Sequence, residues 1–453
     1  MKLSPFGRRQ IYSKLSITIV IRFPAPMFSF RWNVVIGAAL CHAFFIGLVY
    51  ILPSVILSSV REDLQISVSL VVLPLNAYKV GNLVFLPFAG LLLDRYGCRK
   101  CILTGLFFTC ILSFCYIWTT NVWQLLCINI GYAMCNSLCG TAAFIVLVSS
   151  WFRDGLGTAL GLVLSGFSLA GVLFPVGLGT LLEWFGWRST VFFSFLFFTL
   201  VVVPLGWMTL YEGTLHSPST SRSAEVTTMN DYTMVKPLLL SRSFWLLGFE
   251  YFSLAYAQSF PFDYLVTYLH EDASFTYEKA TIFLSIMNAC AVLSKLLGGV
   301  IGDYSNRFKT LLASSFVMLV GVLCLFQSVG KEEDELLSVT NRVGQLTAFS
   351  VLFGLGSGSL WNNLYALVPF CIGTELLGFS QNSLSALHYV GSALGSVMGG
   401  ICKTKTGSFT VDILGIAAIC FLNLVVALYL TWKQPSQPSN QLVAYQNVLS
   451  EIE

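Results

Sequence analysis

The chain has 453 residues, of which 56% are hydrophobic and only 10% are charged, and its formal net charge is +3. Soluble domains carry about 25% charged residues, so this composition excludes a soluble fold and predicts a protein embedded in a membrane. The small positive charge gives no reason to expect a nucleic-acid partner, because the basic residues sit at the ends of apolar segments.

Residues 1–30 precede the first long apolar segment. They are basic, contain serine and lack acidic residues, a composition that resembles a transit peptide. The apolar run at 15–21 is too short to cross a bilayer. We therefore expect a cytoplasmic extension, with Met27 as an alternative start of translation.

Twelve apolar segments are long enough to cross a bilayer, which takes about 20 residues of helix. They predict an all-α membrane protein with two six-helix halves, 31–210 and 243–432, a central loop at 211–242 and a tail at 433–453. The predicted spans are 33–58, 70–93, 101–119, 122–150, 156–182, 189–210, 243–270, 278–303, 309–330, 343–370, 376–402 and 409–432.

The distribution of Lys and Arg predicts the orientation. Of the 25 basic residues, 16 fall in the termini and in the even-numbered loops. Because Lys and Arg concentrate in cytoplasmic loops, we expect both termini and the loop 211–242 inside, and the loop 331–342 outside. The plasma membrane is the expected location, with an organelle membrane as the alternative.

A charged loop occurs at corresponding places in the two halves. Residues 90–100 read GLLLDRYGCRK, and residues 299–309 read GVIGDYSNRFK. Each copy places an acid at the end of one span and basic residues after it, and internal repeats of this kind are typical of carriers whose halves rock around a central site. We expect these loops to govern the conformational equilibrium. The candidate gating residues are Gly90, Asp94, Arg95, Arg99, Asp303 and Arg307.

Glycines recur along the fifth predicted span. Small residues allow helices in a membrane to approach closely. The pattern therefore predicts either plain helix packing or interfaces that slide between two states. These glycines are Gly157, Gly161, Gly166, Gly171, Gly177 and Gly179.

Ionisable side chains inside spans cost roughly 2.5–3.5 kcal/mol on insertion scales, so they are expected to face water, a partner or a substrate. The two lysines are the candidates for binding an anion, and a structural ion pair with one of the two acids is the alternative. Glu250 is the candidate for proton coupling. The two histidines are candidates for substrate binding or proton transfer, or else hydrogen-bonded structural residues. The set is His42, Lys79, Glu250, Asp263, Lys295 and His388.

Motifs of other functional classes are missing from the sequence. It contains no phosphate-binding Gly-x-x-x-x-Gly-Lys-Ser/Thr loop and no local Ser/His/Asp or metal-binding cluster. The sequence therefore predicts neither an ATP-driven pump nor an enzyme, and no cofactor.

Residues 90–100 resemble the loop motif between the second and third spans of the major facilitator superfamily, and residues 299–309 resemble its repeat in the second half. The stretch WFRDGLGTALG at 151–161 and the DRYGCR of 94–99 are similar to the monocarboxylate transporter and oxalate/formate antiporter branch. KLLG at 295–298 resembles their eighth span, with Lys295 at the position of an arginine.

This resemblance implies the major facilitator fold and a secondary transporter of a small organic anion such as a monocarboxylate, working by alternating access. Proton coupling, and the choice between symport and antiport, stay open. One alternative is a carrier of a neutral or zwitterionic solute such as an amino acid. Another is a membrane receptor or scaffold that transports nothing.

Overall fold

The computed structural model describes residues 30–66, 68–152, 154–213, 235–271, 275–328 and 336–433. The predicted N-terminal extension up to residue 29, most of the central loop and the tail after Lys433 lie outside these described residues. Every regular element within them is helical.

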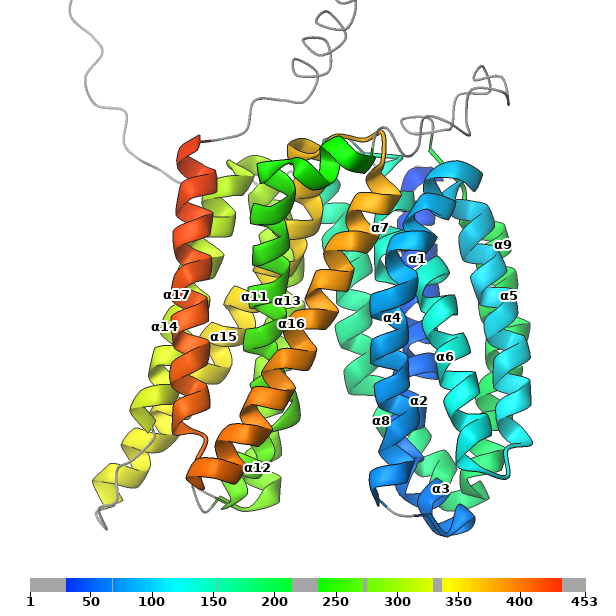
Figure 1. Cartoon of the computed structure of the whole chain (residues 1–453), viewed down its shortest axis with the longest axis horizontal. Helices are drawn as coiled ribbons and strands as arrows, with labels where there is room; N and C mark the ends of the chain where they lie inside the picture. The colour runs from blue at the N-terminus through cyan, green and yellow to red at the C-terminus, as the bar shows by residue number, and fades with distance from the viewer. Residues whose placement is uncertain are drawn as a thin grey trace, which may run out of the picture.

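The helices form two bundles that stand side by side (Figure 1). The first bundle comprises α1 (Phe30–Ile46), the π-helical η1 (Gly47–Ile51), α2 (Leu52–Val55), α3 (Leu57–Leu64), α4 (Val68–Tyr96), α5 (Cys98–Ile117), α6 (Val122–Cys139), α7 (Thr141–Ser149), α8 (Leu156–Phe197), η2 (Phe198–Val202) and α9 (Val203–Thr209). The second comprises α11 (Arg242–Asp263), α12 (Leu265–Glu271), α13 (Tyr277–Tyr304), α14 (Arg307–Ser328), α15 (Leu336–Cys371), α16 (Leu377–Thr406) and α17 (Thr410–Lys433).

Within the described residues, each of the twelve predicted spans is largely helical. By length and composition alone, nine helical stretches of the described residues could cross a membrane. One of them, Leu156–Thr209, has 54 residues and bends in the middle, so it supplies two spans. One of the other two spans is formed by α11 together with α12, and the second is α16. Both are too polar to belong to that set. Their polar side chains mark them as helices that face other protein rather than lipid.

One boundary agrees with the prediction and one differs. The break expected between the fifth and sixth spans lies at Gly186, whose non-helical backbone angles (φ +74°, ψ 170°) join two helices within α8. Glycine accommodates that angle without the strain that a Cβ would add. The outer loop expected at 331–342 is shorter, because α15 already begins at Leu336.

Both ends of the described chain lie at one end of the bundles, together with the edges of the central loop (Figure 1). The charged loops that follow α4 and α13 lie at this end as well, and we call it the closed end because helices of the two halves pack closely there. This arrangement agrees with twelve alternating spans.

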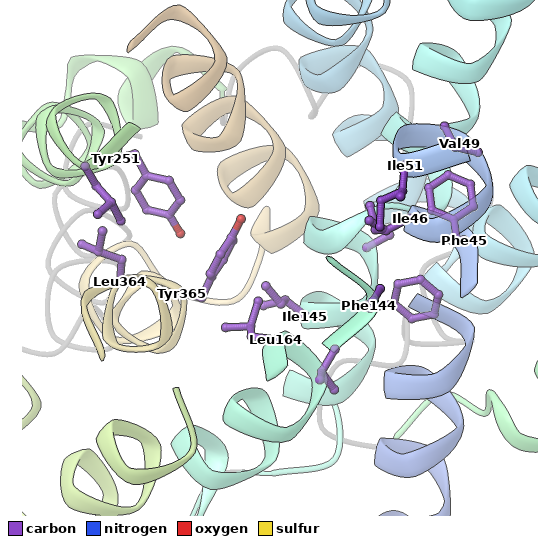
Figure 2. Close-up of a cluster of buried hydrophobic side chains, with 14 of the residues drawn as sticks. Phe45, Ile46, Val49, Ile51, Phe144, Ile145, Leu164, Tyr251, Leu364 and Tyr365 are labelled. Carbon is purple, nitrogen blue, oxygen red and sulfur yellow. The ribbon is translucent and has the colours of Figure 1, made fainter. Parts of the chain in front are cut away.

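One apolar core continues from the first bundle into the second. Figure 2 shows Tyr251, Leu364 and Tyr365 of the second bundle on one side of Ile145 and Leu164 of the first, with side chains of α1 and η1 beyond them. The main contacts between the bundles are α4 against α16 and α8 against α13. These four helices are therefore where the halves must separate if they move.

Candidate functional site

Asp94, near the end of α4, binds the beginning of α16 in the other half. Its carboxylate accepts hydrogen bonds from the backbone N–H groups of Gly378 at 2.7 Å and Phe379 at 2.8 Å. α16 has no side-chain cap of its own. Asp94 therefore satisfies N–H groups that the helix leaves without an acceptor, and its negative charge faces the positive end of the helix dipole.

Asp303, near the end of α13, makes the reciprocal contact. It accepts hydrogen bonds from the N–H groups of Gly157 at 2.9 Å and Thr158 at 2.7 Å, and from the Thr158 hydroxyl at 2.6 Å. α8 also lacks a side-chain cap of its own. Each half thus supplies the cap for one helix of the other half.

Glycine makes these close approaches possible. A Cβ on Gly90 would lie 2.6 Å from Gly378 O, and a Cβ on Gly299 would lie 2.2 Å from Gly157 O. Farther along α8, away from this end, a Cβ added to Gly177 would have no neighbouring atom within 4 Å, and the same holds for Gly171 and Gly179. Among the glycines of the fifth span, Gly157 and Gly161 therefore pack closely against the other half near this end, and Gly166 packs against Ala39 of its own half.

We expect Gly90→Ala and Gly299→Ala to weaken the closed end, because each added methyl group overlaps backbone atoms of the other half. Gly177→Ala is the matched control, since its Cβ would meet open space. The distance between spin labels at Tyr96 and Tyr304, both exposed at the closed end, measures the effect. Unchanged distances in all three variants would show that the contact tolerates the methyl group.

The basic residues of the two loops have different partners. Arg307, the first residue of α14, forms an ion pair with Asp303 near the end of α13 and lies over the Phe370 ring. Arg99 lies over the Tyr211 ring at 4.1 Å and donates a hydrogen bond to Trp207 O at 3.1 Å. Arg95 is exposed. Arg307 therefore supports the capping carboxylate of Asp303 directly.

Lys295 lies in α13, eight residues before Asp303, which places it about 12 Å from the closed end at 1.5 Å per residue. Its side chain is 6% exposed. Nζ donates a hydrogen bond to Ser168 Oγ at 2.5 Å and lies 5.5 Å from the centre of the Phe167 ring, and both of these residues belong to α8. Lys295 thus reaches across the contact between the halves.

Neither predicted lysine forms the ion pair that was the alternative interpretation. In the part of the chain that the structure describes, the ion pairs are Arg188–Asp63 and Arg307–Asp303. Lys295 therefore has neutral neighbours within hydrogen-bond reach, and half-buried Lys79 in α4 has no described carboxylate within ion-pair distance.

The two histidines differ in what their nitrogen atoms contact. His42 is fully buried, with Nε2 at 2.9 Å from Thr141 Oγ1 and Nδ1 at 3.4 Å from Val163 O. Both of its nitrogen atoms are thus engaged, as expected of a structural histidine. The His388 ring lies 4.6 Å from that of Trp361, and its Nε2 is buried without a partner. His388 therefore keeps an unused hydrogen-bonding group.

Glu250 lies elsewhere, inside the second half. It is fully buried in α11, and Oε2 accepts a hydrogen bond from Asn423 of α17. Asp263, by contrast, accepts a hydrogen bond from the Ser396 hydroxyl and is exposed. Glu250 is therefore not part of the contact between the halves.

Several polar residues at this contact escaped the sequence analysis. Asn362 Nδ2 donates hydrogen bonds to Lys295 O at 2.7 Å and Gly157 O at 3.0 Å. Asn136 Nδ2 donates to Asn82 Oδ1 at 2.6 Å and to Tyr389 OH at 3.4 Å. An amide inside an apolar segment was a usable signal, because such a group needs partners within the bundle.

These features together define a membrane carrier: two helical bundles cap each other reciprocally at one end, and a buried lysine stands between them. The Major Facilitator Superfamily profile matches residues 38–332 and 290–446, so the chain belongs to this family. The family confirms the predicted fold, a multi-pass membrane location and a transporter rather than an enzyme.

Individual relatives are distant. An MFS-type transporter of Gibberella moniliformis is 26% identical over 327 residues, which cover 71% of this chain and 72% of the relative. Monocarboxylate transporter 12 of Xenopus laevis is 23% identical over 305 residues, or 62% of each chain. The crystal structure of the E. coli fucose:proton symporter superimposes with a TM-score of 0.66 at 15% identity, covering 88% of this chain and 98% of that one. This last likeness supports the fold alone.

Proposed function

We propose that this transporter carries a small organic anion, such as a monocarboxylate, by alternating access. The observation that carries the proposal is Lys295, a buried lysine between the halves with no described carboxylate as partner. A buried ammonium group is stabilised by an opposing charge, and a substrate carboxylate would supply it. The similarity to monocarboxylate transporter 12 supports the same substrate class.

The remaining candidates have supporting roles in this proposal. His388 offers its unpartnered Nε2 to the substrate, and half-buried Lys79 adds positive charge. Glu250 carries a proton where transport is proton-coupled. The closed end faces the cytoplasm, so both termini are cytoplasmic, and the protein lies in the plasma membrane.

Uptake into proteoliposomes tests the proposal. Labelled lactate or pyruvate should accumulate above the level of protein-free liposomes, and an inward proton gradient should increase the accumulation. A neutral amino acid in parallel vesicles is the control for solute charge. Transport of the amino acid without the anions would replace this proposal by the neutral-solute alternative, and transport of neither would favour a receptor or scaffold.

A further inference from the structure

Glu250, Ser253 and Asn423 form a polar cluster enclosed between α11 and α17. All three side chains are fully buried. Asn423 Nδ2 donates hydrogen bonds to Glu250 Oε2 and, at 2.7 Å, to Ser253 Oγ. Ser253 in turn donates to the Glu250 backbone carbonyl at 3.1 Å. The cluster therefore joins two helices of the same half.

No positive charge balances Glu250 in this cluster. Within the described residues, neither ion pair includes it, and its side-chain partner is a neutral amide. Burying an unpaired carboxylate costs far more than burying a neutral carboxylic acid. One amide hydrogen bond is a small compensation for that charge.

Two oxygen atoms of the cluster lack a donor. Glu250 Oε1 and Asn423 Oδ1 are both buried and have no hydrogen-bond partner. An ionised carboxylate and an amide oxygen are both acceptors, so neither can satisfy the other. A single proton on Glu250 Oε1 changes this, because the resulting O–H is a donor and Asn423 Oδ1 is an acceptor on a side chain already in contact. Exchanging the O and N assignments of the Asn423 amide leaves an acceptor facing the carboxylate, so a proton is needed in that case as well.

We propose that Glu250 and Asn423 form a proton-binding site between α11 and α17, in which Glu250 is a neutral carboxylic acid paired with the Asn423 amide. The site lies inside one half, and its existence does not depend on which solute is carried. It goes beyond the proposed function by naming the Asn423 amide as the group that pairs with the protonated carboxyl group.

Infrared difference spectroscopy of the purified protein tests the protonation state directly. Exposed carboxyl groups are ionised at neutral pH. The spectrum of the wild type minus that of Glu250→Gln should therefore show a carbonyl band of a protonated carboxylic acid, which shifts in heavy water. A carboxylate band in its place would overturn the proposal.

Stability measurements test the pairing. Glu250→Gln should unfold within a few degrees of the wild type, because an amide at this position donates and accepts as the acid does. Asn423→Leu and Glu250→Leu should each lower the unfolding temperature, since each leaves a buried polar group unpaired. The double variant should recover much of the loss, because both partners are then apolar. Additive losses in the double variant would show that the two side chains do not act as a pair.

The uptake assay separates this inference from the proposed function. Failure of every tested solute to enter the vesicles would refute the proposed function and leave the infrared band as the test of the site. Conversely, anion uptake together with a carboxylate band would keep the proposed function and reject the site.

Discussion

Lys295→Gln is expected to abolish uptake of organic anions, whereas Lys295→Arg should retain part of it. Removing one member of a buried charged pair costs about 2–5 kcal/mol, which corresponds to a loss of roughly 30-fold to several thousandfold in affinity. Arginine keeps the charge but presents a planar, wider group, so it fits the space beside Ser168 less well. Anion uptake at matched surface expression measures both variants.

Lys79→Gln is the control for this experiment. Lys79 has the same charge but is only half-buried, and it does not contact the other half through any hydrogen bond in the described residues. We expect it to lower uptake by less than Lys295→Gln does. Wild-type uptake by Lys295→Gln would remove this residue from the substrate site and, with it, the main support for an anionic substrate.

The architecture was predictable because the bilayer imposes a length and a composition on every span. The interruption between the fifth and sixth spans was part of that signal. The short polar stretch from Glu183 to Arg188 contains Gly186, where the structure breaks the helix. α16 was recognised despite its polar side chains because its length was sufficient.

The candidate site was less accessible to sequence reasoning. The repeat singled out Asp94 and Asp303, but the helix starts that they cap lie about 285 and 145 positions away in sequence. The carboxylates of Asp94 and Asp303 bind backbone N–H groups at those helix starts, and no pattern of side chains in the sequence reveals such contacts. Likewise, the sequence does not reveal which side chains of other helices lie near Lys295. The packing shows that its neighbour is Ser168 and not an acidic residue.

The reciprocal caps predict that Asp94 and Asp303 act on conformation more than on substrate binding. Asparagine keeps one of the two acceptor oxygens of Asp94 but loses the other and the charge, so Asp94→Asn should cost about 1 kcal/mol, or roughly a fivefold shift toward opening of the closed end. Asp94→Ala loses both contributions and should cost about 2 kcal/mol, or roughly a 30-fold shift. Transport should slow while equilibrium substrate binding stays within a few-fold.

Spin labels at Tyr96 and Tyr304 report the distance across the closed end, after the exposed Cys115 and Cys127 are replaced by serine. The longer-distance population should grow from the wild type to Asp94→Asn and further to Asp94→Ala. Asp63→Asn is the control, because the exposed ion pair of Asp63 with Arg188 lies within one half.

Asp303→Asn should have the larger effect of the two asparagine variants. Asp303 accepts three hydrogen bonds from α8 and also neutralises Arg307, so its replacement leaves a mostly buried guanidinium group without its partner. Because Asp94 and Asp303 stabilise the same closed end through separate helices, the double asparagine variant should shift the equilibrium by about the sum of the two free energies. Normal turnover and an unchanged label distance in that double variant would contradict a gating role for both carboxylates.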